Sequence, residues 1–156
     1  MEDGHQFHYL NKAYPEDNYS LPKTDKLVDS TMGHELMSFM DAFLDYRQIP
    51  LAKEVQEKTS SITDTDLYCY NVMSFGSKND AAAYQQLFNK VFTTLIVKMM
   101  EVYVNDMITK GIKEANHVQD VEETFKILKS YAIKLNPKKC TFSVRLGKFL
   151  RCMIDQ

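Results

Sequence analysis

The sequence predicts an α+β domain whose elements follow one another as β-α-β-β-α-β, with an insertion after the first strand. Two amphipathic stretches have the three- and four-residue spacing of helices, and short apolar runs rich in aromatic and β-branched residues are typical of strands. The chain has 156 residues, of which 44% are apolar and 26% charged. This length and composition indicate a folded domain or part of a larger one.

The first half of the chain contains two strand-like runs. Residues 1–33 have no apolar periodicity and are interrupted by proline and glycine, so we predict irregular structure there. Leu36 to Met40 is a short apolar run that predicts a buried strand ending at Asp41. The run from Leu67 to Met73 predicts another strand within the insertion.

The middle of the chain predicts a helix and then a hairpin. Asn79 is a favourable N-cap for a long helix from Asp80 to about Lys98. Met100 to Val104 and Met107 to Thr109 read as strands, and the polar pair Asn105-Asp106 between them favours a turn.

The last third predicts a second helix and a terminal hairpin. The helix spans Glu114 to Ala132, and its expected apolar face comprises Val118, Val121, Phe125 and Leu128. Thr141–Val144 and Phe149–Ile154 are predicted to pair around Gly147. Without the insertion, the order is that of a split-βαβ (ferredoxin-like) fold, in which helices cover one face of an antiparallel sheet. This fold alone determines no function.

Charge and cysteine content exclude several classes of protein. The net charge of −2 excludes a strongly basic nucleic-acid coat, although residues 1–70 carry −7 and residues 71–156 carry +5. The N-terminus lacks the apolar core of a secretory signal, and no apolar run approaches the length of a membrane span. Three widely spaced cysteines suit a reducing compartment, so we predict a cytoplasmic or nuclear protein without a membrane partner.

Two carboxylates are candidates for chemistry. Asp41 closes the first strand and Asp106 lies in the central hairpin, which neighbours that strand in a split-βαβ sheet. Carboxylates gathered there can bind Mg²⁺, and two such ions can support phosphoryl transfer. The alternative is that turn geometry alone favours aspartate at both positions. His34-Glu35 begins like the His-Glu-x-x-His motif of zinc proteases. Ser38 occupies the position of the second histidine, so this motif is excluded.

Residues 126–151 form a basic stretch in which lysines and arginines alternate with aromatic residues. Such a surface can follow phosphates and stack bases, so it is a candidate nucleic-acid interface. The alternative is a solvated helix face followed by a solubilising hairpin.

Six blocks resemble one known family in order and spacing. The hairpin sequence Tyr103-Val104-Asn105-Asp106 resembles the Tyr-x-Asp-Asp box of reverse transcriptases. The neighbouring blocks are LNKAYPEDNYSLPKTDKLVD (10–29), MSFMDAFLDYRQI (37–49), EKTSSIT (57–63), YCYNVMSFGSKNDAAAYQ (68–85), LNPKKCTF (135–142) and GKFL (147–150). Together they resemble the polymerase of gypsy-type long-terminal-repeat retrotransposons, most closely those of plants.

This resemblance implies a fold and a reaction. It implies that residues 1–35 are a partial fingers segment and that residues 36–156 are a polymerase palm. The palm would contain a fingers insertion near 50–75 and end at the primer-grip hairpin. The family's activity is RNA-directed DNA polymerisation with Mg²⁺, which needs an RNA or DNA template-primer and deoxynucleoside triphosphates.

The resemblance also assigns residues. It implies that Asp41 and Asp106 bind metal and act in catalysis, with Asn105 at a third catalytic position. Tyr46 would block the ribose 2′-hydroxyl. The segment from Phe75 to Gln85 would support the template and the incoming nucleotide. Lys138 or Lys139 would act on the leaving pyrophosphate, and we predict that Lys139 has this role.

The departures from the family pattern predict a loss of activity. Asn105 stands where the family has the first aspartate of its pair, and an uncharged amide cannot neutralise Mg²⁺ as a carboxylate does. The chain is expected to begin inside the fingers and to stop at the primer grip, without a thumb or ribonuclease H. We therefore expect a truncated, degenerate and inactive polymerase. The alternative is a non-catalytic module that binds nucleic acid or a partner through residues 126–151.

Overall fold

A four-stranded antiparallel sheet lies at the centre of the computed structural model, which describes residues 11–12, 16–43, 48–73, 78–96, 98–111, 113–150 and 152–154. Its strands are β1 (Leu36–Asp41), β4 (Met100–Tyr103), β5 (Asp106–Gly111) and β6 (Thr141–Val144). The spatial order is β4-β5-β1-β6, and every neighbouring pair is antiparallel. The first strand in sequence is therefore an inner strand, and the expected mixture of helices and sheet is confirmed.

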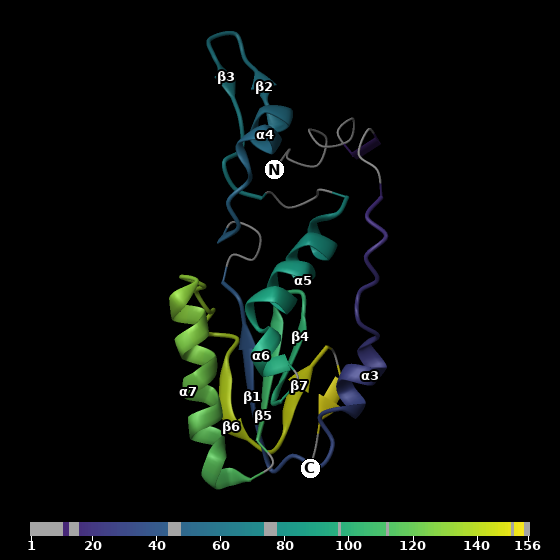
Figure 1. Cartoon of the computed structure of the whole chain (residues 1–156), viewed down its shortest axis with the longest axis vertical. Helices are drawn as coiled ribbons and strands as arrows, with labels where there is room; N and C mark the ends of the chain where they lie inside the picture. The colour runs from purple at the N-terminus through teal and green to yellow at the C-terminus, as the bar shows by residue number, and fades with distance from the viewer. Residues whose placement is uncertain are drawn as a thin grey trace.

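Three helices cover one face of this sheet (Figure 1). They are α5 (Asp80–Val91), α6 (Thr93–Ile96) and α7 (Glu114–Ser130). Side chains on alternate positions of a strand share a face, so Met40, Met100 and Met107 point toward these helices. They pack there against aromatic side chains such as Phe88 of α5. This cluster is the larger of two cores.

The opposite face is covered by a short helix and a small hairpin. The helix is α3 (Thr24–Asp29), and the hairpin pairs β7 (Gly147–Phe149) with β8 (Cys152–Ile154). The second core gathers here and consists of Leu27, Met37, Phe39, Ile108, Phe149 and Ile154. A Cβ atom at Gly147 would overlap the Phe39 ring, so glycine allows β7 to approach the sheet closely.

The insertion forms a separate small unit at the end of the molecule. It contains α4 (Lys53–Gln56), the 3-10 helix η2 (Glu57–Thr59), β2 (Ser61–Ile62) and β3 (Leu67–Tyr68). The β2–β3 hairpin projects away from the main sheet (Figure 1). The strand predicted over Leu67–Met73 is therefore shorter than expected, and Val72 makes only an isolated bridge to Pro50.

Two predictions about the ends of the chain are wrong. The irregular segment 1–33 contains α3, which the second core stabilises by burying Leu27. The predicted terminal hairpin does not form, because β6 pairs with β1 and β7 pairs with β8. A sequence pattern identifies strands, but their partners depend on contacts between distant segments.

The helix predicted over Asp80–Lys98 is interrupted at Phe92. This residue separates α5 from α6 and is fully buried. Asn79 is the N-cap position of α5, but its side chain makes no capping bond, and its Oδ1 atom accepts from the Asp17 backbone instead. None of the helices among the described residues has the length and apolar content needed to cross a bilayer.

Candidate active site

The two predicted carboxylates meet at one end of the sheet. Asp41, the last residue of β1, is the register partner of Asp106, the first residue of β5. Partners in a register point to the same face of the sheet, and here that face is the one that α3 and the β7–β8 hairpin cover. Asp41 is buried, with 6% of its surface exposed, whereas Asp106 is half-buried.

The turn before Asp106 differs slightly from the prediction. Tyr103 pairs with Asp106, so the two turn residues are Val104 and Asn105, and Asp106 already belongs to β5. The Asn105 carbonyl oxygen accepts from the Ala42 backbone nitrogen at 3.0 Å, which ties the turn to the end of β1. The turn thus places Asn105 beside Asp41.

An amide and an ammonium group converge on the same oxygen of Asp41. Asn105 Nδ2 donates to Asp41 Oδ2 at 3.2 Å, and Lys139 Nζ lies 3.3 Å from that oxygen. Lys139 follows the Asn136–Pro137 break after α7, and the Asn136 backbone nitrogen donates to the Asp41 carbonyl oxygen. Part of the charge of Asp41 is therefore balanced within the chain.

These groups line an open cleft of about 400 Å³. Its walls include the two carboxylates Asp41 and Asp106 and the two lysines Lys139 and Lys148, with Phe149 of β7 at one side. The cleft presents both charge signs within a small volume. Such an arrangement can bind a polar, charged ligand, with an aromatic ring available for an apolar part of it.

Gln85 is buried beneath the β4–β5 turn. The sequence placed it among residues that contact the nucleotide, but its side chain has no exposed surface. Its Oε1 atom accepts from the Val104 backbone nitrogen at 2.6 Å, and its Nε2 atom donates to the Val102 carbonyl oxygen at 2.9 Å. In this structure Gln85 therefore contacts the turn instead of lining the cleft. Tyr46 and Phe75 lie outside the described residues.

The donor set does not match two Mg²⁺ ions held by three carboxylates. Asn105 supplies an amide at one of the three positions, and Asp41 already accepts from that amide and from Lys139. Throughout the described ranges, no group of three or more Asp, Glu, His or Cys side chains is placed to hold an ion. The chemistry of the side chains present thus fits a metal pair poorly.

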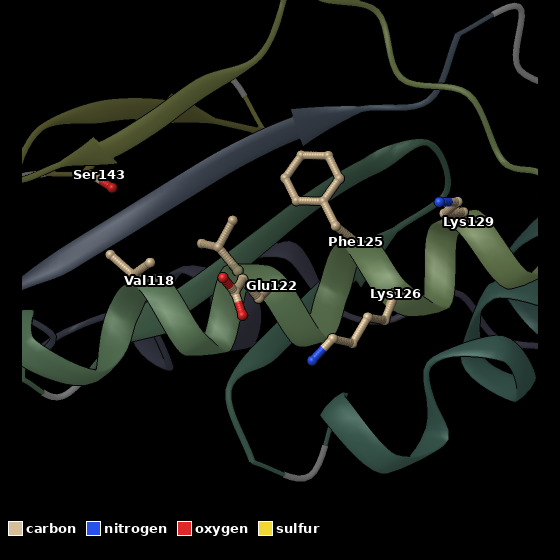
Figure 2. A pocket seen from close by; sticks show the side chains of 7 residues that line it. Val118, Glu122, Phe125, Lys126, Lys129 and Ser143 are labelled. Carbon is tan, nitrogen blue, oxygen red and sulfur yellow. The ribbon is translucent and has the colours of Figure 1, made fainter.

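The basic stretch 126–151 is divided between two places. Lys139 and Lys148 line the cleft, whereas Lys126 and Lys129 lie on α7 beside a shallow groove of about 380 Å³. The groove is mostly apolar, and Figure 2 shows Val118, Phe125 and the two lysines along α7. These four lysines therefore line two separate places.

The apolar face predicted for α7 is only partly correct. Leu128 is buried as expected, but Val118 and Phe125 have 66% and 43% of their surfaces exposed. The buried face is instead completed by the polar residues His117 and Thr124. These two side chains hydrogen-bond to the sheet, His117 to Ser38 and Thr124 to Thr109, which allows them to replace apolar residues.

His117 is fully buried and bonds to the sheet. Its Nε2 atom lies 2.8 Å from Ser38 Oγ, and Ser38 Oγ also accepts from the Ser143 backbone nitrogen. Burial lowers the pKa of His117, and the charge of Asp120 opposes this effect. Hydrophobic periodicity gave no signal for this residue, because it treats a polar side chain as exposed.

Comparisons with known proteins agree with the geometry. A sequence profile described as "Reverse transcriptase (RNA-dependent DNA polymerase)" matches residues 5–154. The chain is 26% identical over 144 residues to the "Retrovirus-related Pol polyprotein from transposon 412" of Drosophila melanogaster. It is also 26% identical over 150 residues to the corresponding polyprotein from transposon gypsy of the same organism. These alignments cover 92% and 96% of the chain but only 12% and 14% of the polyproteins.

A solved structure shares the fold. The foamy viral protease-reverse transcriptase in complex with double-stranded DNA superposes with a TM-score of 0.86 at 18% identity. The superposition covers 97% of this chain and 26% of that one. The predicted relationship to gypsy-type polymerases is confirmed at the level of the family, whereas a plant source stays a prediction.

Proposed function

Because the chain belongs to the reverse transcriptase (RNA-dependent DNA polymerase) family, we propose that it is the palm and part of the fingers of a retrotransposon polymerase whose catalysis is lost or strongly reduced. Residues 36–156 would form a split-βαβ palm with a fingers insertion near 50–75, and residues 1–35 a partial fingers segment. The spatial order β4-β5-β1-β6 supports this division.

One observation carries the proposed loss of activity. The oxygen of Asp41 that faces the turn accepts from the Asn105 amide and from Lys139. Reverse transcriptases generally use Mg²⁺, and Asp41 and Asp106 are the carboxylates that would bind it here. Changes in the surroundings of a metal ligand cost about 10–100-fold in affinity or activity, and replacing a ligand itself should cost more.

The substrates of the proposed parent reaction are a template-primer and deoxynucleoside triphosphates. The matched foamy viral protein binds double-stranded DNA, which supports a template-primer as the partner of the related domain. Lys139 and Lys148 lie in the cleft where they can attract a phosphate group. Tyr46 and Phe75 remain candidates for nucleotide contacts.

The proposal is tested by primer extension on an RNA template with Mg²⁺ or Mn²⁺. We expect no extension by the unaltered chain and detectable extension by Asn105→Asp, because the change restores the third carboxylate. Asn105→Ala serves as the matched control that removes the amide without adding charge. Adding Asp41→Asn to Asn105→Asp should abolish any recovered activity. Mg²⁺-dependent extension by the unaltered chain would contradict the proposal.

A second candidate function is a non-catalytic module that binds nucleic acid. The observation that favours it is the pair of lysines on α7 beside two exposed aromatic rings, Phe125 of α7 and Phe142 of β6, whose centroids lie 5.8 Å apart. Exposed rings of this kind can stack bases while lysines contact phosphates. This surface is separate from the cleft and does not depend on Asn105.

Two charge-reversal variants distinguish the candidates in an RNA-binding assay at increasing salt. Lys126→Glu with Lys129→Glu changes only the α7 groove, and Lys139→Glu with Lys148→Glu changes only the cleft. If the module binds through α7, the first pair should weaken binding strongly and reduce its salt dependence. Equal effects of both pairs, or binding that does not respond to salt, would reject the α7 surface.

A further inference from the structure

The turn that carries Asn105 has a strained backbone. Val104 has a φ of +51°, in the left-handed region. A β-branched side chain rarely adopts this conformation, and in a two-residue hairpin turn the position usually belongs to glycine or asparagine. Strain of this kind persists only where surrounding groups hold the backbone in place. The contacts of Val104 are therefore informative.

Gln85 supplies the group that holds Val104. Its side chain reaches from α5 to the end of β4, where Oε1 accepts from the Val104 nitrogen and Nε2 donates to the Val102 carbonyl oxygen. Both bonds are buried or partly buried, so water competes with them little. One amide thus binds the backbone on both sides of Tyr103.

The bonding continues outward along α5. Gln85 Nε2 also donates to Asn89 Oδ1 at 2.9 Å, and Asn89 Nδ2 donates to the Tyr19 hydroxyl at 2.6 Å. Gln85 and Asn89 are four residues apart and therefore share a helix face. Along this series each residue donates to the next: Val104 to Gln85, Gln85 to Asn89, and Asn89 to Tyr19. Hydrogen bonds in such a chain polarise and strengthen one another.

We propose that Tyr19, Asn89 and Gln85 form a positioning relay that connects the N-terminal segment to the β4–β5 turn. Through this relay the docking of residues 16–20 along α5 determines how Asn105 and Asp106 face Asp41. The three residues act through the turn and contact no substrate. The relay rests on the proposed function, because the position of this turn matters for activity only if the cleft is the polymerase site.

The relay is tested by hydrogen exchange of individual backbone amides, measured by NMR. Gln85→Met removes both bonds to the turn and keeps the side-chain length, so exchange at Val104 should accelerate about tenfold. Tyr19→Phe removes only the distal hydroxyl, and exchange at Val104 should accelerate roughly threefold. Exchange at Ile108, in the middle of β5, should be unchanged in both variants.

Gln86→Met is the matched control. Gln86 is the next residue of α5, and its Nε2 atom donates to Asp17 Oδ2 in the same N-terminal segment. Its side chain bonds to the N-terminal segment and not to the turn, so its replacement should affect exchange at Val104 less than Gln85→Met does. The double variant Tyr19→Phe with Gln85→Met should show the same exchange rate at Val104 as Gln85→Met alone. Once Gln85 no longer bonds to the turn, the loss of the Tyr19 hydroxyl can have no further effect there.

Two results would overturn the relay. One is additive acceleration in the double variant, which would mean that Tyr19 and Gln85 act independently. The other is equal acceleration at Val104 and Ile108, which would indicate general destabilisation. If Gln85→Met does not fold, Tyr19→Phe alone decides the question through the difference between Val104 and Ile108. All of these readouts are independent of primer extension, so failure of the proposed function would be seen separately.

Discussion

The ion pair between Glu101 and Lys110 is buried enough that removing one partner alone should destabilise the fold. Lys110 Nζ lies 2.7 Å from Glu101 Oε1, and the two side chains are only 9% and 15% exposed. Both are on the face of the sheet that α3 covers, and Ser30, which follows α3, donates to the same glutamate oxygen. The Lys110 ammonium also donates to the Ser30 carbonyl oxygen. The pair therefore joins β4, β5 and the end of α3.

Lys110→Met is the informative perturbation. It preserves much of the side-chain volume but leaves the Glu101 carboxylate buried with the Ser30 hydroxyl as its remaining partner among those described here. Breaking a buried pair in this way costs about 3–5 kcal/mol. Because the pair keeps some exposure, we expect a loss of about 3 kcal/mol in the free energy of unfolding. The combination of Lys110→Met with Glu101→Leu should recover most of this loss.

Urea denaturation of the purified chain measures the effect, with the free energy obtained by linear extrapolation. Arg145→Met is the control, because Arg145 pairs with Glu114 at 4.0 Å while both side chains are about 70% exposed. That substitution should cost less than about 0.5 kcal/mol. If Lys110→Met costs no more than Arg145→Met, the Glu101–Lys110 pair is effectively solvated and the reasoning from burial is refuted.

Two further predictions follow from buried contacts. Because burial lowers the pKa of His117, the unfolded chain binds more protons, and stability should be complete above a pH of about 6.5 and fall on acidification below it. Melting temperatures between pH 7.5 and 5 measure this trend, which His117→Gln should flatten. An unchanged slope would assign the trend to a group other than His117. Asp120 would not be that group, because burial raises its pKa and it therefore stabilises the fold on acidification. Gly147→Ala should cost about 1–3 kcal/mol of unfolding free energy through overlap with Phe39. Phe39→Leu should relieve part of that cost in the double variant, and purely additive losses would argue against the overlap.

The local elements could be predicted from the sequence because each depends on neighbouring residues. The apolar run at β1 and the periodicity of α7 gave nearly correct bounds. The placement of Asp41 beside Asp106 also followed, since the predicted order of strands makes β1 and the hairpin neighbours. Pattern and topology together were sufficient for the two central carboxylates.

The remaining features depend on contacts that local patterns do not contain. The partner of β6 is β1, more than a hundred residues earlier, and Gln85 reaches a backbone nitrogen nineteen residues away. On α7 the polar residue His117 is buried and bonds to Ser38, whereas the aromatic residue Phe125 is largely exposed. Amphipathic periodicity cannot anticipate a polar side chain whose partner lies on a distant strand.

The pairing of Asp41 with Asp106 has a consequence for the stability of the domain. Two like charges on facing strand positions repel each other, so the pair of carboxylates at this end of the sheet destabilises the folded state. In this chain an amide and Lys139 soften that repulsion at Asp41. An asparagine at position 105 adds no third negative charge beside this pair, so it should leave the metal-free fold more stable than an aspartate would. Asn105→Asp should therefore lower the melting temperature of the metal-free protein.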